Sequence, residues 1–358
     1  MKIIKNMLFA FVMLFVLVLP VSAQESHTVY EKQVQQITEE NGIDLQQIKQ
    51  APLETIWDAV KKAVVNGTGN NLSVFAKIAA ILLITSLVNL FTPDDNSQIA
   101  KIVSIVSVAA IFNGAIHNFT QQIGSISESM FDIKNFMIAF MPVFAGVSFA
   151  SGEMITSTVY TGFFLISIVS VANFCINYII PSLNVFMAVG VTSAVSSVFD
   201  LKPLCEFYSK AVKTAMTAAV SVLCFMLSVQ TTITQGQDTL AVKTGKMIVT
   251  SAVPVIGSAL QGAVSSVYTS MGVLKGFFGL AGIAVIIGIF MPGIVSLAAN
   301  WAGYSVLIVI SKLLENKAAA DILDCFRQIV EIMLSMTVLF MVLLVFSMSV
   351  MIKLIQGV

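Results

Sequence analysis

Residues 154–199 read MITSTVYTGFFLISIVSVANFCINYIIPSLNVFMAVGVTSAVSSVF, and this stretch decides the fold class. It contains no Asp, Glu, Lys or Arg. A charge-free segment of more than about 20 residues is long enough to cross a bilayer as a helix. Pro181 stands near its middle, so we predict two membrane-spanning helices that turn at this proline. Residues 276–311 are also free of charge, and we predict a second hairpin that turns at Pro292-Gly293.

The composition of the whole chain agrees with a membrane protein. Hydrophobic residues make up 57% of the sequence and charged residues 11%, whereas soluble domains have about 25% charged residues. The net charge is zero and there is no basic block, so nucleic acid is not an expected partner. The four cysteines and two histidines are scattered, which predicts neither a disulfide framework nor a metal site. No catalytic or phosphate-binding motif occurs, so we predict no enzyme activity and no cofactor.

Two parts of the chain resemble each other. The sequence MPVFAGVS at 141–148 is similar to VPVIGSAL at 253–260. Each copy continues with a charge-free stretch, a polar loop that carries Cys205 or Cys325, and a long apolar run. A lysine stands at the same distance before the proline of each copy: Lys134 before Pro142, and Lys246 before Pro254. The pattern predicts two related membrane halves, although chance similarity between apolar segments is an alternative.

The N-terminus has the features of a secretory signal. Two lysines precede a short apolar segment, and small residues end at Ala23, so residues 1–23 are predicted to be a cleaved signal peptide. Residues 24–70 hold apolar side chains at helical spacing and predict an extracytoplasmic pair of amphipathic helices. These helices would rest on the membrane or a partner, or cap the membrane domain of their own chain.

The remaining chain divides into three predicted membrane regions. They are a two-span hairpin at 71–133, a first repeat at 134–233, and a linker with the second repeat at 234–358. We predict an all-α polytopic protein with about eight transmembrane helices. The apolar segment 136–150 is short and contains a proline, which favours a broken or re-entrant helix. Three crossings in each copy would make the copies inverted, and four would make them parallel.

The candidate site residues are polar groups and prolines at the borders of apolar segments. The segment 229–254 reads VQTTITQGQDTLAVKTGKMIVTSAVP and is either part of a pathway mouth or positioning linker, or an ordinary solvated loop. The candidates for a structural or pathway role are Gln230, Asp238, Lys243, Lys246, Pro142, Pro254, Pro181 and Pro292. A small-residue stripe predicts close helix packing at Gly272, Gly276, Gly279 and Gly282.

With these residues in view, the chain resembles the stage III sporulation protein AE family of endospore-forming bacteria. The resemblance covers most of the chain. Its most specific part is Ser228-Val229-Gln230, then Asp238, then Lys243-Thr244-Gly245-Lys246, and Val253-Pro254-Val255-Ile256-Gly257. The Pro142 segment and Ser151-Gly152 are also similar to the family, and the N-terminal region looks shorter.

The resemblance implies a role that the residues alone do not give. Members of the family belong to a set of stage III sporulation A-operon proteins made in the mother cell. With a forespore membrane partner, these proteins form a channel complex across the double membrane around the forespore. The resemblance therefore implies a multi-pass protein of the mother-cell membrane and a permease-like, non-catalytic core subunit. A free-standing secondary transporter of a small solute and a non-conducting scaffold are the alternatives.

Overall fold

The computed structural model describes residues 72–88, 98–151, 154–195, 202–252 and 257–353, and within these ranges the chain is helical, with no strand. The short apolar helix Leu72–Val88 comes first. The labelled helices are α5 (Gln98–Ala150), α6 (Met154–Phe174), the π-helical segment η1 (Cys175–Ile179), α7 (Ile180–Val195), α8 (Lys202–Ala252), α9 (Gly257–Leu313) and α10 (Lys317–Lys353). The predicted signal peptide, the amphipathic region 24–70 and Pro254 lie outside the described residues.

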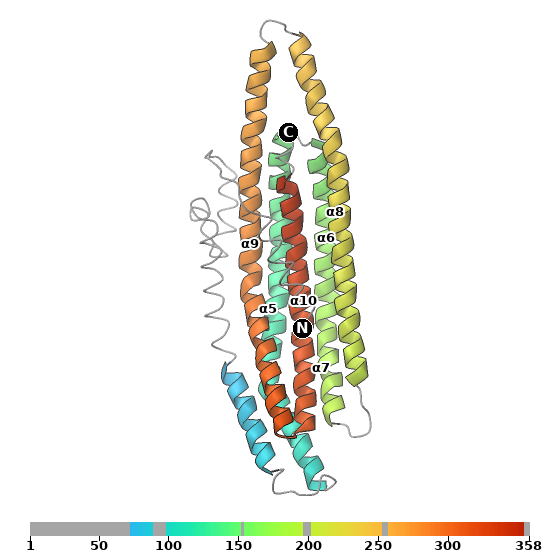
Figure 1. Ribbon diagram of the computed structural model, residues 1–358, viewed down its shortest axis with the longest axis vertical. Helices are drawn as coiled ribbons and strands as arrows, with labels where there is room; N and C mark the ends of the chain where they lie inside the picture. The colour runs from blue at the N-terminus through green and yellow to red at the C-terminus, as the bar shows by residue number, and fades with distance from the viewer. Residues whose placement is uncertain (1–71, 89–97, 152–153, 196–201, 253–256, 354–358) are drawn as a thin grey trace.

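The helices form an elongated antiparallel bundle (Figure 1). α5, α8 and α10 run in one direction along the long axis, and the α6–α7 rod and α9 run in the other. α10 lies in the middle, where it contacts α5, α7, α8 and α9. The far ends of α8 and α9 project beyond the other helices (Figure 1).

Five of the described helices are long and apolar enough to cross a membrane. The candidate spans are Ile102–Ala150, Ser157–Val195, Pro203–Val229, Lys275–Leu313 and Lys317–Val350. Helices suit this environment because they satisfy their backbone polar groups internally. Hydroxyl side chains follow the same rule: Ser167 Oγ donates to Phe163 O at 2.8 Å and Ser347 Oγ to Leu343 O at 2.7 Å.

The predicted turn at Pro181 is wrong, because α6, η1 and α7 form one rod through this proline. A proline lacks the N–H that a preceding carbonyl would accept. The π-helical segment just before it changes the hydrogen-bond register, and Ile180 N–H donates to Cys175 O instead. A local π turn is a recognised way to keep a proline within a helix. The two apolar halves therefore stack end to end.

The other predicted breaks are also helical. Pro142 and Pro292 lie inside α5 and α9, so neither the broken segment at 136–150 nor the turn at Pro292-Gly293 is present. The charge-rich segments 200–213 and 312–328, predicted as loops, are helical from Lys202 and from Lys317. α9 and α10 are joined by a tight turn, in which Glu315 adopts a φ of 55°. Most charged residues of these two segments that the structure describes therefore lie on helices, and Glu315 lies in the turn.

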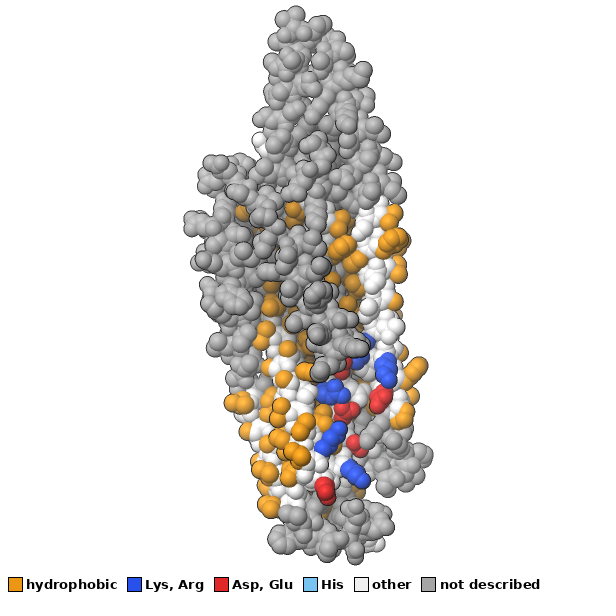
Figure 2. Space-filling view, viewed as in Figure 1, with side chains coloured by type: hydrophobic (Ala, Val, Ile, Leu, Met, Phe, Trp, Pro, Cys, Tyr) orange, Lys and Arg blue, Asp and Glu red, His pale blue; other side chains and the backbone are white. Residues whose placement is uncertain are grey.

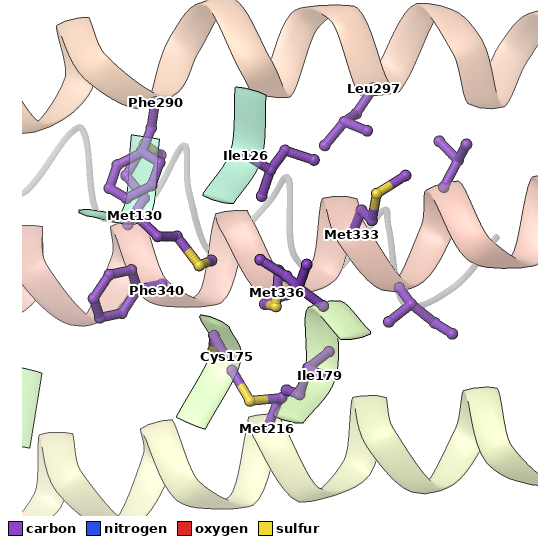
Figure 3. Close-up of a cluster of buried hydrophobic side chains, with 14 of the residues drawn as sticks. Ile126, Met130, Cys175, Ile179, Met216, Phe290, Leu297, Met333, Met336 and Phe340 are labelled. Atoms are coloured by element: carbon purple, nitrogen blue, oxygen red, sulfur yellow. The ribbon is translucent and has the colours of Figure 1, made fainter. Parts of the chain in front are cut away.

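The core lies along α10. Figure 3 shows a part of it, where Met333, Met336 and Phe340 of α10 meet side chains from α5, η1, α8 and α9. An aromatic cluster continues the core towards the Leu72–Val88 helix. Tyr304 lies 5.3 Å from Phe75 and 5.6 Å from Phe119, measured between ring centroids. These rings hold the short helix against α9.

Glycines allow the closest helix contacts. A Cβ atom on Gly303 would lie 2.3 Å from the ring of Phe75, and one on Gly190 would lie 1.9 Å from Cys325 Sγ. At the other end of α9, a Cβ on Gly279 would lie 2.3 Å from Ile352 Cγ1 of α10. Such distances are far below van der Waals contact, so a side chain at these positions would force the neighbouring group to move.

Candidate functional site

A polar cavity of about 590 Å³ lies between the Leu72–Val88 helix, α5 and α9. Its volume falls within the range of about 300–1,000 Å³ that is usual for small-molecule sites. It is lined by Ser73, Val74, Lys77, Asn113, Gly114, His117, Asn118, Gln121, Gln122, Ser125, Ile126, Gly293, Ser296 and Leu297. Carboxamides and hydroxyls dominate this lining, in contrast to the apolar helices around it.

The ionisable side chains that line the cavity are basic. Lys77 brings an ammonium group and His117 an imidazole, and none of the described residues that line the cavity is acidic. Lys77 and His117 are both exposed, whereas Asn118 and Gln122 are buried. The lining is therefore suited to a negatively charged group near Lys77 and to hydrogen bonds deeper in the cavity.

Gln122 is the least satisfied group of the lining. Its Nε2 donates to Asn118 Oδ1 at 2.7 Å, but its Oε1 has no hydrogen-bond partner among the described residues. Its side chain is 9% exposed. A buried acceptor without a donor lowers the stability of the fold by about 1–3 kcal/mol. Such an acceptor is usually satisfied by a water molecule or a ligand.

The unsatisfied polarity continues along α9. Asn300 is fully buried, and both its Oδ1 and its Nδ2 lack a partner among the described residues. Tyr304 OH is also without a partner in this part of the chain. Asn300 follows the cavity residues Ser296 and Leu297 by about one helical turn. One face of α9 therefore carries a line of buried polar groups that starts at the cavity.

A second polar feature is a network of charged residues between α8 and α10. Lys213 Nζ lies 3.0 Å from Glu331 Oε1, and Arg327 Nη1 lies 3.7 Å from Glu331 Oε2. Arg327 Nη2 also donates to Asp324 Oδ1 at 2.7 Å. We call these four residues the charged belt. Figure 2 shows basic and acidic side chains gathered in the lower part of one face of the bundle.

The charged belt is partly buried, since Lys213 and Glu331 are only 20% and 21% exposed. A further charged group, Lys134 Nζ of α5, lies 3.5 Å from Asn173 Oδ1 of α6, within hydrogen-bond reach. Charges inside an apolar bundle are unfavourable unless they are paired, and they often mark a functional region. No group of three or more His, Cys, Asp or Glu that could hold a metal ion occurs in the described part of the chain.

The structure separates the candidate residues that the sequence singles out. Gln230, Asp238, Lys243 and Lys246 lie on the long helix α8 and not in a loop; their side chains are not among those described. Pro142 lies in α5 and Pro181 in α7. Pro292 precedes Gly293 in the cavity wall, so it is the one of these prolines within the described residues that adjoins the cavity.

The glycine stripe lies on α9. Gly276, Gly279 and Gly282 are buried, and Gly279 and Gly282 face the end of α10. The side-chain surroundings of Gly272 are outside the described set. Gly279 and Gly282 therefore pack against α5 and α10 of the same chain.

The cavity is not among the sites that the sequence predicts. Lys77 reads as a lysine at the end of an apolar span, and His117 reads as an isolated histidine. The residues come from three helices that are far apart in sequence. The sequence nevertheless carries a signal: Gln121 and Gln122 follow Asn118 by three and four residues, which is the spacing of one helix face. A row of carboxamides on one side of such a helix indicates a polar contact within the bundle.

Comparison with known proteins gives one family match. The family model of stage III sporulation protein AE matches residues 34–355. The searches of curated proteins and of solved structures gave no match. The family match covers most of the chain, including all the helices that line the cavity and carry the charged belt. With five membrane-competent helices among its described residues, this chain is thus a sporulation-related membrane protein that belongs to the stage III sporulation protein AE family.

Proposed function

We propose that this protein is a non-catalytic, permease-like core subunit of a channel or transport complex between the mother cell and the forespore. It would lie as a multi-pass protein in the mother-cell membrane around the forespore. Its partners would be other stage III sporulation A-operon membrane proteins and a forespore membrane protein. Family membership supports the sporulation setting, and the polar cavity supports a role in passing a solute.

The single observation that carries the proposal is polar lining within an apolar bundle. Inside a membrane bundle, polar side chains that face a cavity typically belong to a substrate or ion pathway. Here the cavity adjoins the proline-containing middle of α9, and buried unsatisfied groups continue from it along the same helix. A protein that served only as an anchor would gain nothing from such groups, because each one weakens the core.

We also propose that the two halves of the bundle are parallel copies. Cys205 and Cys325 hold equivalent places in the two copies, and their side chains lie close together near the starts of α8 and α10. Pro181 and Pro292 both lie in the rods that run in the opposite direction, α6–α7 and α9. The first copy ends on α8 and the second begins on the same helix. Counting three crossings in each copy therefore does not imply inversion, because one helix serves both.

The length of each rod limits how many times it can cross the bilayer. The span Ser157–Val195 has 39 residues, which is about 58 Å of helix, and the hydrocarbon core of a bilayer is about 30 Å thick. A rod of this length could cross the bilayer twice only if it bent into a hairpin. A form with eight crossings would therefore need the rods to bend at their prolines. We propose the straight form, in which the rods extend beyond one hydrocarbon layer.

Sporulating cells provide the test of the proposed function. The chromosomal gene is replaced by a tagged wild-type copy or a Gln122→Leu copy, and both heat-resistant spores and co-purifying membrane proteins are measured. A complex subunit with a working cavity predicts that Gln122→Leu retains its partners but lowers spore yield at least tenfold. If Gln122→Leu leaves spore yield unchanged, the cavity has no role in the function and the scaffold alternative holds.

The polar cavity also favours a second candidate, a free-standing transporter. That candidate predicts solute uptake into liposomes by the purified chain alone. The complex predicts no uptake without the partners. The same preparation therefore separates the two functions.

A further inference from the structure

We infer that the cavity between the Leu72–Val88 helix, α5 and α9 binds a small, non-aromatic organic anion that also carries an N–H or O–H donor, of the kind of an amino acid or a hydroxy acid. The inference names the solute class of the proposed function and rests on it. Three features of the lining lead to this class: its charge, its unsatisfied acceptor, and the absence of aromatic rings among its described residues.

The charge selects an anion. Lys77 and His117 line the cavity without an acidic residue among its described lining. A carboxylate or phosphate oxygen would accept charge-assisted hydrogen bonds from the Lys77 ammonium, and these are stronger than bonds between neutral groups. A cation would find no counter-charge in this lining.

The unsatisfied acceptor selects a donor on the same molecule. Gln122 is 9% exposed, and its Oε1 accepts no hydrogen bond from the described residues. The Nε2 of the same group is already used by Asn118. In this orientation of the amide, Oε1 is an acceptor that an N–H or O–H group can satisfy, and an ammonium or a hydroxyl of the ligand supplies such a donor.

The rest of the lining limits the shape of the ligand. No Phe, Tyr or Trp belongs to the described lining, so a nucleobase or another flat ring finds no stacking surface there. The apolar contribution comes from Val74, Ile126 and Leu297. Ile126 and Leu297 also belong to the core cluster of Figure 3, so this side of the cavity is formed by well-packed side chains. A short aliphatic chain with polar ends fits this arrangement.

L-glutamate and glutarate form a matched pair of probes, because they differ only in the α-ammonium group. Binding to the purified full chain in detergent is measured by isothermal titration calorimetry, with L-malate and succinate as a second pair. We expect the donor-bearing member of at least one pair to bind with a Kd below about 1 mM and several times more tightly than its partner. Glutarate carries more negative charge, so charge alone predicts the opposite order. Equal or weaker binding of both donor-bearing members overturns the inference.

Variants connect binding to the cavity. Lys77→Gln is expected to weaken binding at least tenfold, and Lys77→Arg to retain it. Gln122→Met is expected to remove the preference of glutamate over glutarate. Lys210→Gln is the control, because Lys210 is a 76% exposed lysine on α8 outside the cavity. Equal effects of Lys77→Gln and Lys210→Gln contradict the assignment of the site.

A second measurement needs no ligand. Ser125 is an exposed residue of the cavity lining, and Ser125→Cys can be labelled with methanethiosulfonates of opposite charge. We expect the rate of the sulfonatoethyl reagent, relative to that of the trimethylammonium-ethyl reagent, to be higher than the same ratio measured with a free thiol, and Lys77→Gln to remove this enhancement. The unchanged chain, whose cysteines are largely buried, gives the background. A ratio in the Ser125→Cys chain equal to that of the free thiol overturns the inference.

An anionic lipid headgroup is the competing source of the same chemistry. Phosphatidylglycerol and phosphatidylcholine are therefore added to the detergent micelles, and thermal stability is measured with and without L-glutamate. Stabilisation by L-glutamate that depends on Lys77 supports a soluble ligand. Stabilisation by phosphatidylglycerol alone overturns it. A chain that fails every binding test but still assembles with its partners and supports spores overturns the ligand class and leaves the proposed function intact.

Discussion

Lys213 of α8 and Glu331 of α10 form a salt bridge with 3.0 Å between Nζ and Oε1, and each side chain is only about one-fifth exposed. Arg327 approaches the same carboxylate at 3.7 Å and holds Asp324 with its other nitrogen atoms. The charged belt thereby ties the central helix to α8. Its partial burial places it between exposed ion pairs, which contribute little, and buried pairs, whose disruption is costly.

Glu331→Gln is expected to destabilise the chain more than Lys213→Met. Removal of Glu331 deprives both Lys213 and Arg327 of a partner, whereas Arg327 keeps Asp324 in either variant. We expect a loss of roughly 1–3 kcal/mol for Glu331→Gln, measured from thermal or denaturant unfolding in detergent. Lys210→Met is the matched control, because the pair of Lys210 with Glu206 is exposed. A loss in the control as large as in Glu331→Gln contradicts this account.

Gly303→Ala is expected to loosen the Leu72–Val88 helix. The new Cβ would lie 2.3–2.7 Å from three atoms of the Phe75 ring, and the ring would have to leave its edge contact with Tyr304. Overpacking of this kind is unfavourable by about 1–3 kcal/mol. Gly124→Ala is the control, since a Cβ there meets nothing within 4 Å, and it should be neutral or slightly stabilising. Unfolding midpoints of the two variants provide the comparison.

Deleting Tyr178 is expected to be tolerated better than deleting Ile166. Tyr178 lies in the π-helical segment, which accommodates one more residue than an α-helix would, so its loss should leave an α-helix with the buried face of α7 in place. Deletion of Ile166 rotates the rest of the rod by about 100°. The two side chains are similarly exposed, at 67% and 69%. Size-exclusion profiles and unfolding midpoints of both variants measure the difference; equal loss would mean that the π segment does not set the register.

Cysteines at positions 204 and 315 are expected to react with a membrane-impermeant thiol reagent from the same side, and a cysteine at 149 from the other. Leu204 and Phe149 are 55% and 49% exposed, and Glu315 lies in the turn between α9 and α10. The bundle places the starts of α8 and α10 at one end and the end of α5 at the other (Figure 1). Labelling of 204 and 315 from opposite sides would reject parallel halves.

The sequence was sufficient for the helical membrane class, because long stretches without charge leave few other structures for the backbone. It was insufficient at the prolines. A proline near the middle of an apolar run is compatible with a turn or with a continued helix, and the π turn at Cys175–Ile179 that favours the second outcome has no mark in local composition. The choice depends on packing, such as the fit of Gly190 against Cys325.

The candidate site was harder to predict for a related reason. A polar segment between apolar stretches predicts a loop, and this applies to the segment with Gln230, Asp238, Lys243 and Lys246, but the segment is part of α8. The cavity depends on Lys77, Gln122 and Ser296 from three different helices. Their proximity follows from long-range packing of the Phe75 and Tyr304 rings, which a one-dimensional pattern does not contain.

The central place of α10 has a consequence for biosynthesis. α10 follows all the helices it touches in chain order, so α5, α7, α8 and α9 leave the ribosome before the surface that joins them exists. In a bilayer, inserted helices are individually stable and associate in a later step. The contacts of α5 with α6 and α9, and of α6 with α8, can form before α10 is made, whereas the apolar core along α10 is completed only when this last helix is inserted.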